Sequence, residues 1–206
     1  ESQSQAISVC AYPSFAIRWF IPRWGRFYDS HPQIDLRLTT TLNPADFDSG
    51  AYHMAIQVLP DGGPRPGLRA RKLLEIDTFP VCSPDVARAI KTPADLTRMT
   101  LLHGHPRPRD WPRWCEAAGV SGLDTTRGLR FESLNLAFQA AIEGLGVAIG
   151  VEALVEEDLK HGRLVRLFDT ARRSNHPFYL VYPDASTDDP NVAALSDWLI
   201  EEGRGD

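Results

Sequence analysis

Short apolar segments alternate with amphipathic stretches along most of the chain, and this alternation predicts an α/β fold. Ala6–Ala11 and Met54–Val58 are compact apolar runs that indicate strands. Ile34–Thr40 alternates apolar and polar residues, which indicates a strand with one exposed face. Between Ala6–Ala11 and Ile34–Thr40, residues Phe15–Asp29 have a helical pattern, and Pro22 either opens this helix or kinks it.

A second series of strands and helices follows and closes the chain. The further predicted strands are Leu68–Leu74, Phe79–Cys82, Thr100–His103, Gly128–Phe131, Val147–Gly150, Leu164–Phe168 and Phe178–Tyr182. The further predicted helices are Pro84–Ile90, Trp111–Ala118, Leu134–Glu143, Glu152–His161 and Pro190–Glu202. Because strands and helices follow each other in turn, we expect mostly parallel sheets.

Two serines stand where a strand gives way to a helix. Ser14 follows the first strand, and Ser133 follows the strand that ends at Phe131. A serine at this position is a strong helix N-cap. A helix N-terminus also attracts anions, and ligands of open α/β sheets bind beyond the carboxyl ends of the strands. The two serines are therefore either caps alone or the polar edge of a ligand site.

Composition places the chain among globular proteins. It has 206 residues with 43% hydrophobic and 24% charged residues, and no apolar run is long enough to span a membrane. The net charge of −5 makes the chain a poor candidate for binding nucleic acid by itself, because the phosphate backbone is also negative. Cys10, Cys82 and Cys115 are widely spaced in apolar surroundings, so we expect buried free thiols in a reducing, cytoplasmic compartment.

Motifs of catalysis and cofactor binding are absent from the sequence. The segment Gly144–Gly150 has the wrong spacing for a dinucleotide fingerprint, and we expect Gly144 to end a helix and Gly146 to allow close packing. His103, His105 and Cys115 are candidate metal ligands by residue type, but no fourth ligand has a recognisable spacing. We expect no metal, no cofactor and no enzymatic activity.

Several motifs in order along the chain resemble the effector-binding domain of LysR-type transcriptional regulators. The motifs are Pro13-Ser14-Phe15-Ala16, Trp19 with Ile21-Pro22-Arg23, Phe27, His31-Pro32 with Ile34-Asp35-Leu36 and Leu38, Ala55-Ile56, Pro80-Val81-Cys82-Ser83-Pro84, Pro93-Ala94-Asp95-Leu96, Thr100-Leu101-Leu102-His103, and Gly144 with Gly146-Val147-Ala148. Each motif is weak alone, but the set covers nearly the whole chain. The resemblance is closest to the branch that contains the glycine-cleavage activator and the chromosomal β-lactamase regulator.

The resemblance implies two Rossmann-like subdomains joined by two crossover strands, a periplasmic-binding-protein-like fold of type II. Subdomain I would hold residues 1–76 and 179–206, and subdomain II would hold residues 77–178. An N-terminal winged helix-turn-helix domain would bind DNA and is absent from this chain. The resemblance also implies a homodimer that pairs residues 15–29 with residues 134–143, and a tetramer for the full-length protein.

The implied function is to sense a small metabolite in the cleft between the subdomains and to transmit the signal through the oligomer to the DNA-binding domains. Carried over position by position, the effector-binding residues would be Ser14, Phe15, Thr40, Thr41, Asp46, His103, Ser133 and Phe178. Asp46 could equally cap a turn. The identity of the effector and the choice between activation and repression stay open.

One departure from the family pattern concerns charge. Gln57 stands where relatives commonly have an arginine, which would clamp a carboxylate in two hydrogen bonds. The exchange disfavours an effector whose recognition needs that positive charge and favours a different or less acidic ligand. A solute-binding protein of a transporter would share the fold and is the alternative function. A small α/β enzyme is a third possibility, which the missing catalytic motifs disfavour.

Overall fold

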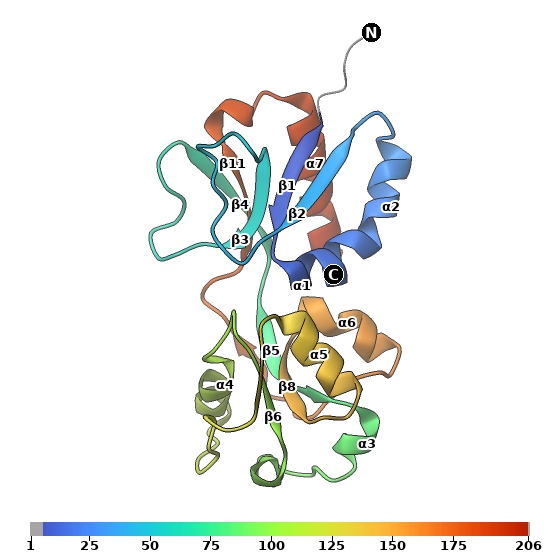
Figure 1. The fold of residues 1–206 in the computed structure, drawn as a ribbon, viewed down its shortest axis with the longest axis vertical. Coiled ribbons are helices and arrows are strands. Elements are labelled where there is room, and N and C mark those ends of the chain that lie inside the picture. Colours follow the sequence, from blue (N-terminus) through green and yellow to red (C-terminus); the bar gives the residue numbers. More distant parts are fainter. Residues whose placement is uncertain (1–5, 206) are drawn as a thin grey trace. The chain divides into compact units, whose positions relative to one another are not determined.

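The computed structural model describes residues 6–205, which form two compact units (Figure 1). Within the described residues, unit 1 comprises residues 6–75 and 175–205, and unit 2 comprises residues 76–174. Five positions lie on the other side of the expected boundaries, namely Ile76 and residues 175–178. Ile76 belongs to unit 2, where its carbonyl accepts a hydrogen bond from Ser174 N–H. Phe178 belongs to unit 1, because it begins a strand that pairs with Val58 and Leu74.

Unit 1 is built on a sheet whose strands, within residues 6–205, follow the order β2-β1-β3-β11-β4. The bounds are Ile7–Ala11 for β1, Leu36–Thr40 for β2, Met54–Val58 for β3, Leu68–Leu74 for β4 and Phe178–Pro183 for β11. β2, β1 and β3 are parallel, whereas β11 is antiparallel to β3 and β4. The parallel pairing brings the carboxyl ends of β1 and β2 together, with Ala11 opposite Thr40.

The first helical stretch of unit 1 changes its helix type partway along. α1 covers Pro13–Phe15, the π-helix η1 covers Ala16–Phe20, and α2 covers Ile21–Ser30. Pro22 carries no N–H, so a regular α-helix would leave the carbonyl of Arg18 without its donor. Ile21 N–H instead donates to the carbonyl of Ala16, five residues back. The proline is therefore accommodated by a wider helical turn, and the stretch starts before Phe15.

α7, Pro190–Arg204, closes unit 1 and packs against the sheet and α2. It follows the short 3-10 helix η3, Asp184–Ser186. Leu195 and Leu199 of α7 are completely buried. Phe27 of α2 contacts Trp198 with ring centroids 5.1 Å apart, and Glu202 binds the guanidinium of Arg26. An apolar contact and an ion pair thus join the two helices.

Unit 2 has a second sheet with the order β10-β5-β8-β6-β7 in the described part of the chain, and β9 also pairs with β5. The bounds are Asp77–Cys82 for β5, Leu101–Gly104 for β6, Leu129–Phe131 for β7, Val147–Val151 for β8, Val165–Arg166 for β9 and Arg172–Arg173 for β10. β7, β6 and β8 are parallel, and β5 is antiparallel to β8. The parallel arrangement expected from the sequence is therefore limited to three strands in each sheet, because the strands near the crossings run the other way.

Five helices follow the strands of unit 2 in the described residues. They are α3, Pro84–Ala87; the 3-10 helix η2, Pro93–Arg98; α4, Asp110–Ala118; α5, Leu134–Ile142; and α6, Glu152–Lys160. Gly144 follows α5 with a φ of +79°, a conformation that favours glycine. A Cβ on Gly146 would lie 2.1 Å from the carbonyl oxygen of Thr100. Both expectations for these glycines are confirmed.

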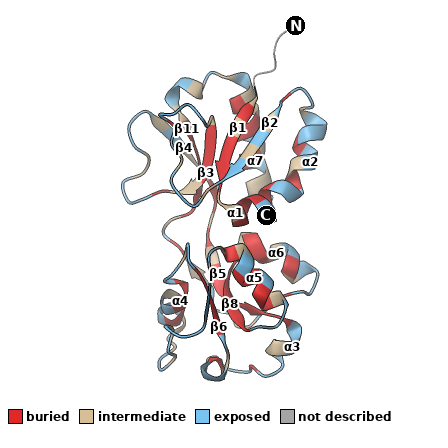
Figure 2. Cartoon of the chain, viewed as in Figure 1, coloured by how far each residue is buried: buried red, intermediate tan, exposed pale blue. Residues whose placement is uncertain are grey.

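The central strands of both sheets are buried (Figure 2). On one face of the first sheet, Cys10, Ala55 and Val181 pack with Phe47 and Leu59. In unit 2 one cluster of buried side chains comprises Cys82, Ile90, Leu96, Leu101, Trp111, Trp114, Cys115, Val147 and Ile149. Each unit therefore has its own hydrophobic core. None of the helices formed by residues 6–205 has the length and apolar character that a bilayer span requires.

Candidate functional site

The ends of β1 and β2 bring the first group of expected site residues together in unit 1. Thr40 ends β2 opposite Ala11, and Thr41 N–H donates to the Ala11 carbonyl at 3.0 Å. The chain then turns from β1 into α1, which contains Ser14 and Phe15. Four of the expected residues thus lie around the carboxyl ends of two adjacent parallel strands, which is where open α/β sheets bind ligands.

Ser14 is buried, although it is not the cap that the sequence suggested. The N-cap position of α1 is Tyr12, whose side chain makes no capping hydrogen bond. Ser14 is 5% exposed and lies inside α1. Next to it, Phe15 is completely buried, and its ring lies 5.0 Å from that of Phe178 in an edge-to-face arrangement. Two of the expected effector-binding residues, Phe15 and Phe178, are therefore in contact with each other.

Asp46 lies on an exposed loop of unit 1 and holds a local turn. Its Oδ1 accepts hydrogen bonds from the N–H groups of Asp48, at 3.1 Å, and Ser49, at 3.4 Å. Gln57, at the position of the missing arginine, holds the same loop because its Oε1 accepts from Ala45 N–H at 3.3 Å. The turn-capping interpretation of Asp46 thus describes its contacts. Both of these hydrogen bonds use Oδ1, and ligand binding by Asp46 stays a prediction.

His103 and Ser133 lie in unit 2, at the ends of β6 and β7. His103 is buried in β6, and its Nε2 lies 2.7 Å from the Arg127 carbonyl oxygen, so the ring is fixed from one side. Ser133 is the N-cap of α5, and its Oγ accepts from Leu136 N–H at 3.3 Å. The cap function predicted for Ser133 is confirmed.

The eight expected residues thus fall into two groups. Ser14, Phe15, Thr40, Thr41, Asp46 and Phe178 belong to unit 1, and His103 and Ser133 belong to unit 2. In each unit the group lies near the carboxyl ends of parallel strands. Whether one ligand contacts all of them remains a prediction from the sequence.

Metal-ligating and thiol side chains are not gathered in the described part of the chain. No group of three His, Cys, Asp or Glu residues lies close enough there to hold a metal ion. Cys10, Cys82 and Cys115 are free and buried, as the sequence indicated. Burial raises the pKa of all three thiols, that of Cys82 to about 12, so they remain protonated and unreactive at neutral pH.

Two residues near these groups were missed at the sequence level. The hydroxyl of Tyr12 accepts a hydrogen bond from Val58 N–H at 3.1 Å, which fastens the start of α1 to the end of β3. Arg107 follows β6, and its Nε donates to Asp110 at 2.6 Å. Tyr12 stands directly before Pro13-Ser14 and could have been noticed. Arg107 lies among Pro and Arg residues whose spacing carries no signal.

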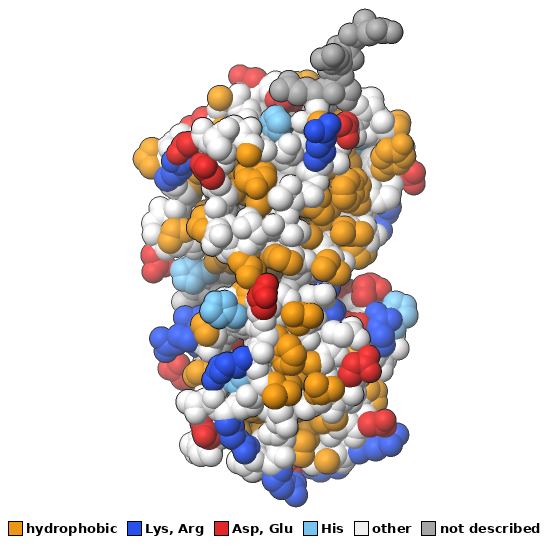
Figure 3. Space-filling view, viewed as in Figure 1, with side chains coloured by type: hydrophobic (Ala, Val, Ile, Leu, Met, Phe, Trp, Pro, Cys, Tyr) orange, Lys and Arg blue, Asp and Glu red, His pale blue; other side chains and the backbone are white. Residues whose placement is uncertain are grey.

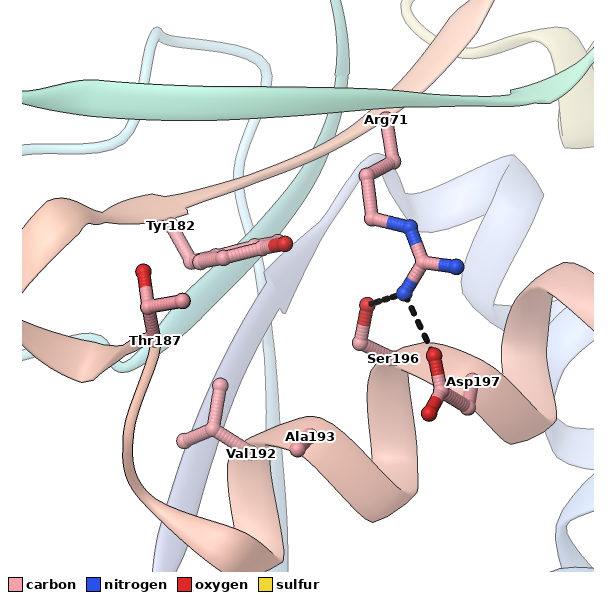
Figure 4. Close-up of a pocket in the computed structure, with 7 residues that line it drawn as sticks. All are labelled: Arg71, Tyr182, Thr187, Val192, Ala193, Ser196 and Asp197. Carbon is pink, nitrogen blue, oxygen red and sulfur yellow. Dashed lines mark hydrogen bonds and ion pairs between the residues drawn. The ribbon is translucent and has the colours of Figure 1, made fainter.

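Unit 1 also contains a pocket of about 170 Å³ between the sheet and α7 (Figure 4). Arg71 crosses it and donates to Ser196 Oγ and to Asp197 Oδ1, both at 2.7 Å. Tyr182 and Thr187 line the other end, and the hydroxyl of Thr187 is buried without a partner among the described residues. None of the eight expected residues lines this pocket.

Comparison with known sequences gives a consistent set of relatives. The model of the LysR substrate binding domain matches residues 1–204. The chain is 33% identical over 208 residues to the glycine cleavage system transcriptional activator of Escherichia coli (strain K12), covering 100% of this chain and 67% of that protein. It is 32% identical over 204 residues to the HTH-type transcriptional activator AmpR of Pseudomonas aeruginosa, covering 97% of this chain and 68% of that protein.

Comparison with solved structures supports the same grouping. The effector domain of the regulator AmpR of Pseudomonas aeruginosa superposes with a TM-score of 0.83 at 30% identity, covering 98% of this chain and 96% of that one. The AmpR effector binding domain from Citrobacter freundii superposes with a TM-score of 0.84 at 26% identity, covering 98% and 100%. These likenesses confirm the predicted fold class, an α/β periplasmic-binding-protein-like fold of type II.

Proposed function

The chain belongs to the LysR substrate-binding domain family and is the effector-binding domain of a transcriptional regulator; from this premise, we propose that it binds a small metabolite between its two units and passes the signal to DNA-binding domains through an oligomer. In this proposal, a winged helix-turn-helix segment outside this chain contacts DNA. The regulator acts in the cytoplasm. The relatives named above are transcription regulators, so neither the transporter nor the enzyme alternative is retained.

The observation that carries the ligand proposal is the arrangement at the carboxyl ends of β1 and β2. A buried hydroxyl, that of Ser14, lies next to an apolar pair, Phe15 and Phe178. The adjacent strand end supplies Thr40 and Thr41. Ligand sites typically combine apolar walls with a few convergent polar groups. This combination suits a small polar metabolite with an apolar part, whose hydroxyl or carboxylate oxygen Ser14 would bind.

The test of this proposal begins with a ligand. A thermal-shift screen against a metabolite library selects compounds that raise the melting temperature, because a ligand that binds only the folded state stabilises it. Calorimetry then compares the parent chain with Ser14→Ala and Asp46→Ala. We expect affinity to fall about tenfold in each variant, the effect of losing one hydrogen bond of about 1.4 kcal/mol.

The control is Ser121→Ala, which removes an exposed serine from the loop after α4. It should bind as the parent does. If Ser14→Ala and Asp46→Ala also bind with parental affinity, the assignment of the unit 1 residues is wrong.

Exposed apolar side chains support the proposed dimer. Ile17 and Ile21 are about half exposed and Tyr28 is 60% exposed, and their spacing places them on one face of the first helical stretch. Leu136 on α5 is 51% exposed, and Leu145 just after that helix is 48% exposed. Figure 3 shows hydrophobic side chains at the surface over α2 and over α5. We propose that a second copy of the chain covers these surfaces. In this dimer, α2 of one protomer packs against α5 of its partner.

A further inference from the structure

Three arginine side chains gather in unit 2 where α4 contacts β10. Arg107 lies in the loop between β6 and α4, Arg113 lies on α4, and Arg172 lies on β10. Trp114 of α4 donates from Nε1 to the carbonyl of Thr170 at 3.0 Å. The segment that leads into β10 is thereby held against the helix. We refer to Arg107, Arg113 and Arg172 as the arginine cluster.

Two guanidinium groups of the cluster present buried N–H groups that the described residues leave unpaired. These are Nη2 of Arg107 and Nη1 of Arg172. The Arg107 side chain is only 15% exposed, and its orientation is fixed because Nε donates to Asp110 at 2.6 Å. Buried polar groups of native proteins are nearly always paired, and an unpaired one lowers stability. Both groups are therefore available to an acceptor.

The charges around Arg172 favour an anion. Burial, and then the positive charges of Arg113 and Arg107, lower the pKa of Arg172. Asp110 and Glu116 act in the opposite direction, but two carboxylates face three guanidinium groups. The guanidinium fork matches a pair of carboxylate or phosphate oxygens, so an oxyanion would satisfy both the charge and the free N–H groups.

The cluster lies near the carboxyl ends of the parallel strands of unit 2, where His103 also lies. Arg172 pairs with Thr78 near the start of β5, and β5 is antiparallel to β8. The start of β5 therefore lies beside the carboxyl end of β8, which is parallel to β6. Arg107 and His103 line the same small cavity after β6. Open α/β sheets bind ligands beyond these carboxyl ends of the strands.

We propose that the arginine cluster binds a small oxyanion, the carboxylate or phosphate group of an organic molecule. The cluster would supply in unit 2 a positive charge that is missing at position 57 of unit 1, where Gln57 replaces the arginine common in relatives. That this anion is part of the effector rests on the function proposed above. Binding of the anion itself does not.

The test uses the whole 206-residue chain with inorganic phosphate and succinate as probes, at constant ionic strength set with chloride. Calorimetry compares the parent with Arg107→Lys, which keeps the charge beside Asp110 but loses the fork, and with Arg172→Gln. Arg88→Gln is the control, because Arg88 of unit 2 is 81% exposed and its loss changes the net charge equally. A preference for phosphate or for succinate distinguishes the two sources of the oxyanion.

We expect saturable binding of at least one probe, about tenfold weaker in Arg107→Lys and Arg172→Gln and unchanged in Arg88→Gln. Without any probe, Arg172→Gln should melt at a higher temperature than the parent, because it removes a partly buried charge that Arg107 and Arg113 repel. Binding that is equal in all four proteins, or no binding beyond the effect of chloride, would overturn the proposal.

Ser14→Ala separates this proposal from the function proposed above. It should keep phosphate or succinate binding while losing affinity for an effector found in the library screen. If an effector binds the parent and neither anion does, the arginine cluster is wrongly assigned and the proposed function stands.

Discussion

Single carboxylates determine how several turns of this protein are held, and Asp95 is the clearest case. Its Oδ2 accepts hydrogen bonds from the N–H groups of Lys91 and Thr92, both at 2.9 Å. The bond from Thr92 N–H forms one half of a capping box at the start of η2, whose Leu96 is completely buried. Both bonds favour the ionised carboxylate and lower the pKa of Asp95 to about 2. The charge of one side chain thus contributes to placing a core residue.

We expect Asp95→Asn to lower the melting temperature at neutral pH, because an amide oxygen replaces a carboxylate as acceptor. A pKa lower in the folded than in the unfolded state gives stability that is present above the unfolded value, near 4, and is lost as pH falls toward 2. The difference in melting temperature between parent and variant should therefore shrink between about pH 5 and pH 3. Thermal denaturation followed by circular dichroism across this range measures it.

The control is Asp85→Asn, because the carboxylate of Asp85 is exposed and pairs with the equally exposed Arg88. This variant should melt close to the parent at every pH. A constant difference between Asp95→Asn and the parent down to pH 3 would contradict the assignment of the effect to the ionised carboxylate.

At the level of helices and strands, periodic patterns were enough for most of the fold. Met54–Val58 and Leu68–Leu74 are strands with the predicted bounds, because their apolar runs are bounded by turn residues. β10 was not predicted, since its two arginines carry no strand signal and depend on pairing with β5. The π-helical turn was also missed. A proline predicts a disturbed helix, but neighbouring packing decides how the disturbance is absorbed.

The same limit applies to the site. Sequence order identified Ser133 as a cap because capping depends on residues within one turn. The arginine cluster was not identified, because it joins Arg107 and Arg172 from segments 65 residues apart, as their numbers show. Contacts between distant segments are set by the tertiary fold, and no local spacing reports them.

Close packing where the chain enters β8 gives a prediction at this scale. Gly146→Ala would put a methyl group 2.1 Å from the Thr100 carbonyl oxygen, a backbone atom that cannot move alone. We expect the free energy of unfolding to fall by about 1–3 kcal/mol or more. Chemical denaturation monitored by tryptophan fluorescence measures this change.

Gly25→Ala is the matched substitution in α2, where a methyl group would meet nothing within 4 Å. Alanine is the better helix former, so the free energy of unfolding should rise by about 0.5–1 kcal/mol. Equal effects of the two substitutions would mean that close packing at Gly146 is not what requires glycine there.

For the whole molecule, net charge and exposed apolar surface act on association in opposite directions. The net charge of −5 repels like chains. Ile17, Ile21 and Tyr28 nevertheless expose apolar area on one helical face, and burying such area in a partner stabilises a complex by about 25 cal/mol per Å² before the entropic cost of association. The proposed dimer therefore depends on this apolar face and should be sensitive to a single charge placed in it.

We expect the parent chain to sediment at twice its mass of 23.0 kDa at micromolar concentration and Ile21→Asp to sediment as a monomer. An aspartate in the middle of the apolar face would be buried without a partner in the dimer, which weakens association by about two orders of magnitude or more. Because Ile21 is half exposed in one chain, the substitution should leave the melting temperature of the monomer nearly unchanged.

Leu42→Asp is the matched control, since Leu42 is 38% exposed and lies outside the helices. Dissociation by both variants would indicate a general charge effect, and a parent chain that sediments as a monomer would contradict the pairing of α2 with α5.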